Sequence, residues 1–194
     1  MKRTFDFLAS LGGLFLFSPL LVLFSLLIKL TSKGTVFFIQ ERVGENGVFF
    51  KMIKFRSMQM IQESNSTISV KGDMRITKIG YFLRKYKLDE LPELWNVLVG
   101  EMSLVGPRPD VPGYADMLVG EQRKILKLKP GITGPASLKY ANEEVLLALQ
   151  DNPEKYNNEV IYPDKVNINL DYYYNNNLWI DIKIIFATIF RISY

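Results

Sequence analysis

The stretch from Phe5 to Ile28 reads FDFLASLGGLFLFSPLLVLFSLLI, and its one charged residue, Asp6, stands near the start. A helix of this length reaches across the roughly 30 Å hydrocarbon core of a bilayer. Because proline removes a backbone N–H and clashes with the preceding turn, we expect a break at Ser18-Pro19, with the Ser18 hydroxyl covering a freed carbonyl. A chain of 194 residues is too small to cover such a helix as a core element. The stretch therefore predicts a membrane helix broken at these two residues.

Basic residues flank this stretch on both sides, with Lys2 and Arg3 before it and two lysines after it. A spanning helix usually carries basic residues mainly at its cytoplasmic end. Basic flanks at both ends favour a re-entrant helix that enters one leaflet and returns, and a tilted span is the alternative. A cleaved signal peptide fits poorly, because the run is long and no small-residue cleavage site follows it. We expect residues 1–33 to form the re-entrant helix and residues 34–194 a cytoplasmic domain.

The composition limits the chemistry that is available. The net charge of +4 favours anionic partners such as nucleic acid, anionic lipid or phosphorylated small molecules. The sequence contains neither cysteine nor histidine, which excludes disulfides, thiolate nucleophiles and zinc sites made of those residues. Any catalysis must use carboxylates, hydroxyls, Lys, Arg or a hard cation bound by oxygen.

One β-hairpin is predicted in the middle of the chain. The runs 36–40 and 48–53 are rich in β-forming residues, and Asn46-Gly47 between them tolerates positive φ. Apolar spacing predicts helices near Ile79, over 121–128 and over 143–150, while Gly and Pro predict loops at 106–109 and 130–135. The polar stretch over 59–71 is expected to be a mobile loop, and a second polar stretch starts at Asp151.

The C-terminal residues about 178–192 show apolar and aromatic side chains at helical spacing, which predicts an amphipathic helix. Such a helix can lie in a membrane interface, and packing on the core is the alternative. The run Tyr172-Tyr173-Tyr174 suits either headgroup anchoring or the core. The predicted fold class is α+β and mainly helical, with a re-entrant membrane helix, a small β-hairpin and a compact catalytic domain with amphipathic interfacial helices.

Asp89 and Glu90 are the strongest candidates for chemistry. Pro92 is tolerated only in the first turn of a helix, so we expect the pair to open one. Carboxylates there meet unpaired N–H groups and the positive end of the helix dipole. The alternative is that Asp89 is only an N-cap, worth about 1 kcal/mol.

Basic residues surround this pair in the sequence: Lys54, Arg56, Arg84, Lys85 and Arg108. A helix N-terminus ringed by guanidinium groups suits a phosphorylated anion, which Arg binds bidentately. A diphosphate fits better than nucleic acid, because the basic residues are scattered and interrupted by acidic ones.

Several motifs resemble one family in order and spacing. They are Lys2-Arg3-Thr-Phe-Asp6, Phe38-Ile-Gln40-Glu41-Arg42-Val-Gly44, Lys54-Phe55-Arg56-Ser57-Met58, Leu83-Arg84-Lys85-Tyr-Lys-Leu88-Asp89-Glu90-Leu91-Pro92, Asn96-Val-Leu, Met102-Ser103-Leu104-Val105-Gly106-Pro107-Arg108-Pro109 and Lys129-Pro130-Gly131-Ile-Thr133-Gly134. Together they resemble the bacterial sugar transferases, monotopic phosphoglycosyl transferases that begin glycan assembly on undecaprenyl phosphate. The resemblance covers nearly the whole chain and points to the minimal catalytic form.

The resemblance implies a reaction in which Asp89 attacks the sugar-bearing phosphorus of a UDP-sugar, releasing UMP and leaving an aspartyl-phosphosugar. Undecaprenyl phosphate then takes the phosphosugar. Glu90, with Asp89, would hold Mg²⁺, and Arg84 and Arg108, with Lys54 and Arg56, would bind phosphate. The implied location is the cytoplasmic face of the bacterial inner membrane, among membrane lipid.

The resemblance also places Gln40, Glu41 and Arg42 in a structural role, tying the hairpin to the core. After Gly134 the sequence departs from the family pattern, since a Gln-containing stretch ending in Gly-Arg is replaced by Pro135-Ala-Ser-Leu-Lys-Tyr. This departure leaves uridine recognition open, and the sequence sets neither the sugar nor the oligomeric state.

Two other functional classes compete with this hypothesis. A non-enzymatic membrane scaffold explains the apolar ends but not an Asp-Glu pair beside several arginines. A membrane-attached nucleic-acid binder would show binding that falls steeply with salt.

Replacing Pro19 by Ala tests the cause of the re-entrant turn. Because alanine restores the missing N–H, we expect the helix to straighten toward a span and to carry one flank across the membrane. Cysteine-accessibility labelling at each flank measures this topology. Labelling that still places both flanks in the cytoplasm would argue against proline as the cause.

Overall fold

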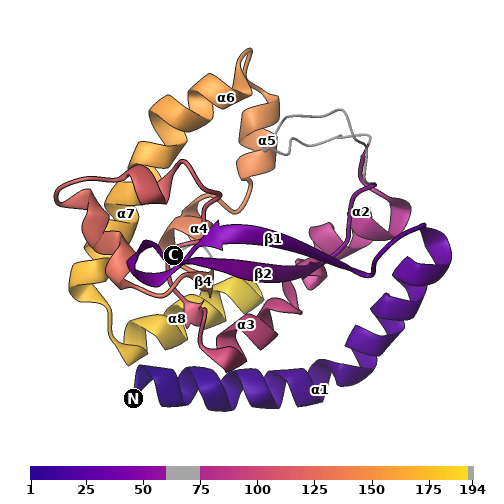
Figure 1. Cartoon of the computed structure of the whole chain (residues 1–194). Coiled ribbons are helices and arrows are strands. Elements are labelled where there is room, and N and C mark those ends of the chain that lie inside the picture. Colours follow the sequence, from indigo (N-terminus) through magenta and orange to yellow (C-terminus); the bar gives the residue numbers. More distant parts are fainter. Residues whose placement is uncertain (60–74, 192–194) are drawn as a thin grey trace.

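Helix α1 (Lys2–Thr31) follows the edge of the molecule and changes direction midway, so that it wraps around one side of the other elements (Figure 1). The helix continues through Pro19, which cannot donate a hydrogen bond to the carbonyl of Phe15. The Ser18 hydroxyl donates to that carbonyl instead, at 2.8 Å. The role predicted for Ser18 is confirmed, and the predicted interruption is a bend within a continuous helix.

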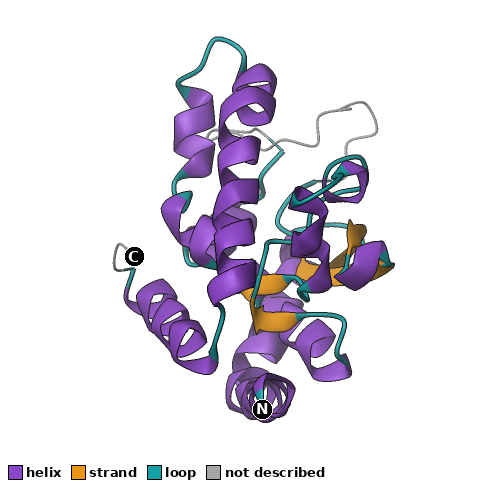
Figure 2. Ribbon diagram, turned by 90° about the vertical axis from the view of Figure 1, so that its left-hand side faces the viewer, coloured by secondary structure: helices purple, strands orange, loops and turns teal. Residues whose placement is uncertain are grey.

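The computed structural model describes residues 1–59 and 75–191. The other helices are α2 (Lys78–Lys85), α3 (Glu93–Val99), α4 (Pro135–Lys139), α5 (Glu143–Ala148), α6 (Pro153–Tyr156), α7 (Tyr162–Asn175) and α8 (Leu178–Phe190). The strands are β1 (Phe37–Val43), β2 (Phe49–Phe55), β3 (Ser103–Val105) and β4 (Gly131–Thr133). In the turned view, helices lie around the two small sheets, as the predicted α+β class requires (Figure 2).

The hairpin is confirmed where Asn46-Gly47 predicted it. Strands β1 and β2 pair antiparallel, with Phe37 opposite Phe55 and Val43 opposite Phe49. The connection includes Asn46 at φ 57° and Gly47 at φ 79°, a backbone region that these two residues enter at little cost. Of the polar loop predicted over 59–71, all but Gln59 lies outside the described residues.

Both ends of α1 are attached to the rest of the protein. Near its start, Asp6 is 3% exposed and accepts hydrogen bonds from the Ser103 hydroxyl at 2.9 Å and the Leu104 N–H at 3.1 Å. Arg3 donates to the carbonyls of Val97 and Leu98 at the end of α3. At the other end, the Arg56 guanidinium donates to the carbonyls of Ser32 and Lys33. The two ends of α1 therefore lie on one and the same body.

Two predictions about the second half of the chain need correction, and a third region is helical where no helix was predicted. The region 121–128 forms a 3₁₀ segment (Gln122–Lys127) and no α-helix. The predicted loop over 130–135 contains β4, which pairs parallel with β3, and the first residue of α4. The polar stretch from Asp151 is helical, running through α6, a π-helical turn (Asn157–Ile161) and α7. The short helix predicted over 143–150 is confirmed as α5.

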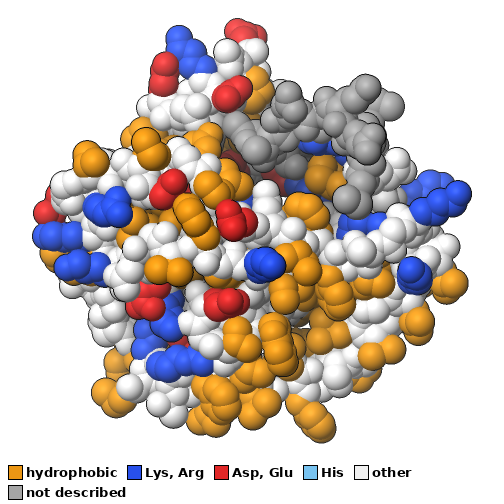
Figure 3. Space-filling view, in the orientation of Figure 1, with side chains coloured by type: hydrophobic (Ala, Val, Ile, Leu, Met, Phe, Trp, Pro, Cys, Tyr) orange, Lys and Arg blue, Asp and Glu red, His pale blue; other side chains and the backbone are white. Residues whose placement is uncertain are grey.

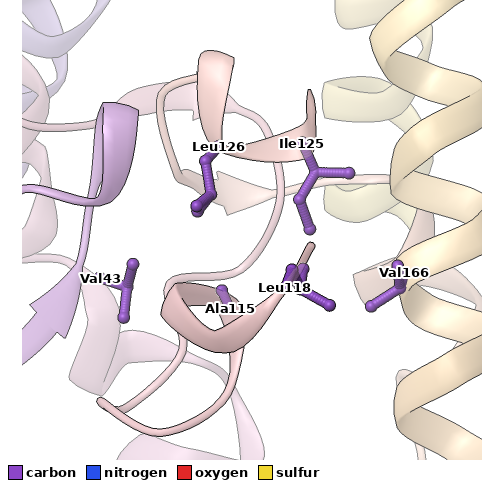
Figure 4. Close-up of a cluster of buried hydrophobic side chains, with 6 residues drawn as sticks. All are labelled: Val43, Ala115, Leu118, Ile125, Leu126 and Val166. Carbon is purple, nitrogen blue, oxygen red and sulfur yellow. The ribbon is translucent and has the colours of Figure 1, made fainter. Parts of the chain in front are cut away.

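Packing explains why the polar stretch is helical. A buried cluster joins the end of β1 to α7 through the irregular segments between them (Figure 4). Its members are Val43, Ala115, Leu118, Ile125, Leu126 and Val166. Val166 and Tyr172 of α7 pack into buried clusters, and this tertiary packing stabilises a helix whose sequence is mostly polar.

Apolar side chains remain exposed on α1 and α8. In the space-filling view they gather along the lower margin, where Figure 1 places α1 (Figure 3). By length and composition α1 could cross a membrane, and it is the one such helix within residues 1–59 and 75–191. On α8, Ile184 and Ala187 are buried while Trp179 is 75% and Phe190 63% exposed. The predicted C-terminal helix is thus confirmed, with one face in the core and one face apolar and exposed.

The buried carboxylate of Asp6 provides a test of how α1 is held. Asp6→Ala removes two hydrogen bonds to a charged acceptor and deprives the buried Ser103 hydroxyl of the carboxylate that accepts its hydrogen bond. We expect a loss of about 2–4 kcal/mol in the free energy of unfolding, measured by denaturation in detergent. Asp151→Ala, at an exposed position, is the matched control. Equal stability of the two variants would show that Asp6 does not hold the helix.

Candidate active site

Asp89 and Glu90 lie in a 3₁₀ turn (Leu88–Glu90) between α2 and α3. The turn follows Lys87, which has φ 58°, and closes with a bond from the Leu91 N–H to the Leu88 carbonyl. The prediction that the pair opens an α-helix is therefore wrong in detail, since α3 begins at Glu93 with Pro92 as its N-cap. The α-helical bonds begin only after the proline, because its nitrogen carries no hydrogen.

Asp89 has an oxygen that none of the described residues contacts as a hydrogen-bond donor. The side chain is 8% exposed, and its Oδ1 is buried without a partner in residues 1–59 and 75–191. The N-cap alternative is wrong, because the turn has no side-chain cap bond. Burial raises the pKa of Asp89, Glu90 raises it further, and Lys54 and Arg84 oppose the rise. The site therefore holds a desolvated carboxyl with a free oxygen.

Glu90 is held in the opposite electrostatic state. Its Oε1 accepts hydrogen bonds from the Arg108 guanidinium at 2.6 Å and from Lys54 Nζ at 3.1 Å. Burial alone raises the pKa of Glu90, but the charges of Arg108 and Lys54 outweigh it and hold the pKa well below its usual range. The negative charge of Glu90 in turn raises the pKa of Arg108. Glu90 is thus a permanent anion bound between two cations.

Glu93 is a third carboxylate, which the sequence analysis missed. It is 1% exposed, and its Oε1 lies 3.1 Å from Lys54 Nζ, so that this ammonium group bridges Glu90 and Glu93. Burial raises the pKa of Glu93 to about 7, against the pull of Lys54. No helical spacing signals it in the sequence, because Glu90 lies in the 3₁₀ turn and Glu93 in α3, and its burial depends on tertiary packing.

Lys54 reaches these carboxylates because β2 is tied to α3. Asn96 of α3 is 1% exposed and donates to the Lys51 carbonyl at 2.8 Å. The Asn96 Oδ1 accepts from the Ile53 N–H at 3.1 Å. One buried carboxamide therefore sets the register between the strand that carries Lys54 and the helix that carries Glu93.

The loop that carries Arg108 is fixed by the hairpin. Arg42 donates to the Pro109 carbonyl at 3.1 Å and to Gln40 Oε1 at 2.6 Å. The Val43 N–H donates to the Asp110 carbonyl at 2.9 Å. These contacts confirm the structural role expected of Gln40 and Arg42. The Arg108 side chain stays 43% exposed, so part of its guanidinium remains accessible beside Glu90.

Two predicted basic residues have other partners. Arg84 bonds to Glu144 of α5, and its charge acts on Asp89. Arg56 is 4% exposed and donates to the carbonyls of Ser32 and Lys33, directly after the end of α1. The structure thus brings Lys54, Arg84 and Arg108 to the carboxylates, while Arg56 anchors α1.

Lys54 and Arg84 line one large cavity together with the Asp89-Glu90 pair and Arg108, whereas Glu93 lies behind its wall. Asp89, Glu90 and Arg108 form part of its wall, and residues of β2, α2, α4, α5 and α7 form the rest. Asp110 also lines it, and burial raises the pKa of this carboxyl to about 6. Buried carboxylates, cations and a free carboxyl oxygen in one cavity are suited to binding and reacting with a phosphorylated ligand.

Comparison with known proteins agrees with this class of site. The family described as bacterial sugar transferase matches residues 1–193, and the chain therefore belongs to that family. It is 40% identical to the UDP-glucose:undecaprenyl-phosphate glucose-1-phosphate transferase of Klebsiella pneumoniae, over 98% of this chain and 39% of that protein. It is 38% identical to the UDP-N-acetylgalactosamine-undecaprenyl-phosphate N-acetylgalactosaminephosphotransferase of Aeromonas hydrophila, over 97% of this chain and 43% of that protein.

The chain spans less than half the length of these two relatives. A shorter relative is covered almost completely: the exopolysaccharide production protein PSS of Rhizobium leguminosarum bv. phaseoli is 39% identical over 97% of this chain and 93% of its own length.

Glu93 gives the site a pH-dependent stability. Its pKa is about 7 in the folded protein and near 4.5 in the unfolded chain, so the folded state binds more protons between these values. The contribution of Glu93 to stability is therefore largest below about pH 4.5 and is lost as the pH rises toward 7. We expect Glu93→Gln to gain roughly 1–3 kcal/mol relative to the unchanged protein between pH 5 and pH 8.

Unfolding midpoints in detergent across this pH range measure the effect. Glu154→Gln, at an exposed position of α6, is the control, and its midpoints are expected to follow those of the unchanged protein. A Glu93→Gln curve that runs parallel to the control would contradict a raised pKa.

Proposed function

We propose that this protein transfers a sugar 1-phosphate from a UDP-sugar to undecaprenyl phosphate and releases UMP. The observation that carries the proposal is the buried Asp89 Oδ1, which lacks a donor among the described residues and lies in a cavity with Lys54, Arg84 and Arg108. The names of the relatives supply the substrate class, since two of them are described as acting on UDP-sugars and undecaprenyl phosphate. Such a reaction begins the assembly of a bacterial polysaccharide or other glycan.

The reaction proceeds in two displacements at the same phosphorus. Asp89 attacks the sugar-bearing phosphorus, the new bond joins its carboxyl oxygen to phosphorus, and the bond to UMP breaks. A phosphate oxygen of undecaprenyl phosphate then attacks, and the bond from phosphorus to Asp89 breaks. A carboxylate is a competent covalent nucleophile for phosphoryl groups, and the sequence offers neither His nor Cys for the task. An oxygen without a hydrogen-bond donor keeps its lone pairs available for this attack.

The charged residues around Asp89 have separate roles in binding the donor and in holding the site together. Glu90 keeps Arg108 and Lys54 beside Asp89 through its hydrogen bonds. Arg108, partly exposed, and Arg84 bind phosphate oxygens of the donor, because guanidinium groups match them bidentately. Lys54 adds a point charge, and Arg56 contributes mainly by holding the end of α1.

The carboxylates also suit Mg²⁺. Magnesium is commonly held by one or two carboxylates together with substrate phosphates, and the described residues include no cluster of three or more ligating side chains. Asp89 and Glu90 are the residues that would hold it, since Oδ1 of Asp89 is free of donors among those residues. When bound, the ion neutralises the diphosphate and makes UMP a better leaving group.

The membrane anchor supports an acceptor with a lipid tail. Both ends of α1 attach to one body, which supports a re-entrant helix that enters and leaves the same leaflet. The exposed apolar faces of α1 and α8 favour insertion in the bilayer and its interface, at the cytoplasmic side of the inner membrane. The phosphate of the acceptor then lies at the depth of the site.

Asp89→Asn tests the proposed nucleophile. An amide lacks the charge needed to attack phosphorus, so we expect UMP release from UDP-sugars to fall by roughly 10³-fold or more. Intact-mass analysis of the unchanged protein with a panel of UDP-sugars and Mg²⁺, without acceptor, should show an adduct of one phosphosugar, absent from Asp89→Asn.

Asp151→Asn, which makes the same chemical change at an exposed position, should retain full UMP release. Full turnover by Asp89→Asn would refute the covalent route. A membrane scaffold, the competing class, predicts no UMP release from any of the three proteins.

A further inference from the structure

Two buried polar atoms far along the chain from Asp89 also lack partners. Asn169 of α7 is 7% exposed, and neither its Oδ1 nor the Oγ of Ser137 on α4 meets a hydrogen-bond partner within residues 1–59 and 75–191. Leaving such a group unsatisfied costs about 1–3 kcal/mol, and folded proteins rarely accept this without a functional reason. Neither residue belongs to the charged network around Glu90.

Both atoms belong to the wall of the cavity that contains Asp89 and Arg108. Helices α4 and α7 are neighbours, because the Tyr140 hydroxyl and Lys139 Nζ each donate to Asp164 Oδ2 at 2.7 Å. Ser137 precedes Tyr140 by three residues, which places it on the same side of α4. Asn169 lies farther along α7 than Asp164. The two groups therefore come from neighbouring helices that both contribute to the wall of this cavity.

The charges change along the cavity wall. At Asp89 and Arg108 the charges are concentrated and suit phosphate. The charge of Asp110 interacts with Arg108 and with Lys165 of α7. Lys165 is in turn paired with Glu143 at 2.7 Å. The part of the wall formed by α4 and α7 also carries neutral atoms without a partner in residues 1–59 and 75–191, namely the Asn169 carboxamide oxygen and the hydroxyls of Ser137 and Tyr162. This end of the cavity therefore suits a neutral part of the ligand that carries hydrogen-bonding groups.

We propose that Asn169 and Ser137 bind the uracil base of the nucleotide donor, while the carboxylate end of the cavity binds its diphosphate. The inference rests on the proposed function and assigns the base-recognition site within it.

The hydrogen-bonding pattern of uracil matches these groups. Its edge presents a carbonyl, an N–H and a second carbonyl. The Asn169 carboxamide offers an acceptor with an adjacent donor, and the Ser137 hydroxyl offers a further donor. In cytosine, the ring nitrogen between the exocyclic amine and the carbonyl carries no hydrogen and is an acceptor. If cytosine bound in the same orientation as uracil, Asn169 Oδ1 would therefore face an acceptor where uracil presents a donor. Recognition of this kind discriminates strongly, because the wrong base leaves buried groups unpaired.

Nucleotide binding by single variants tests the assignment. The probes are UMP and CMP, titrated calorimetrically into the purified full-length chain in detergent. Asn169→Ala and Ser137→Ala should each weaken UMP binding by at least roughly tenfold and should reduce the preference for UMP over CMP. Asn169→Asp replaces the donor by an acceptor and should reduce that preference most. Asn167→Ala, exposed on the same helix, should bind like the unchanged protein.

The outcomes separate this inference from the proposed function. If the unchanged protein releases UMP from a UDP-sugar but Asn169→Ala and Ser137→Ala bind UMP within twofold of it, the base site is wrong and the transferase function stands. If the variants lost affinity equally for UMP and CMP, the two residues would have only a structural role, and the proposed base site would be wrong. If Asn169→Ala does not fold, judged by its unfolding midpoint, Ser137→Ala and Asn169→Asp decide the question. No UMP release from the unchanged protein would refute the function itself.

Discussion

Glu90 is an anion buried in the protein, and the arrangement of the site depends on keeping it charged. Removing a carboxylate from water is expensive unless it is paired and hydrogen-bonded, and Arg108 and Lys54 supply both conditions. This requirement brings together three parts of the chain that are distant in sequence: the end of β2, the turn before α3 and the loop after β3. Asn96 and Arg42 then hold those parts in register through backbone carbonyls.

The same network gives neighbouring carboxyl groups different properties. Glu90 has a strongly lowered pKa, Asp89 a raised one, and Glu93 a pKa of about 7. Arg108 pairs with Glu90, and Lys54 is shared between Glu90 and Glu93, so these cations compensate the burial of Asp89 and Glu93 less completely than that of Glu90. Pairs of titratable groups whose environments separate their pKa values are typical of catalytic sites. In this site, Glu90 provides fixed charge while Asp89 keeps a free oxygen.

Much of the fold followed from local chemistry in the sequence. Asn46-Gly47 determined the hairpin, and the apolar spacing determined α2, α5 and α8. The helical region 153–175 was missed because its buried side chains are few and widely spaced among Asn and Tyr, so that no amphipathic period is visible. Asp89, Glu90, Lys54, Arg84 and Arg108 were identified beforehand and do come together. Glu93 and Asn169 were not, because only tertiary packing shows that a side chain is buried.

Direct packing ties the site to the apolar helix α1. Helix α3 begins three residues after Glu90 and packs against α1, where Gly13 lies so close to Leu94 that an added Cβ would be 3.2 Å from its Cδ1. Arg3 joins α1 to the last carbonyls of α3, and Asp6 joins it to β3. The carboxylates are therefore connected to the apolar helix by one short rigid element and not by a linker. In the proposed function, a helix held in this way would fix the depth at which Asp89 meets the lipid-linked phosphate, so α1 would help to position the acceptor.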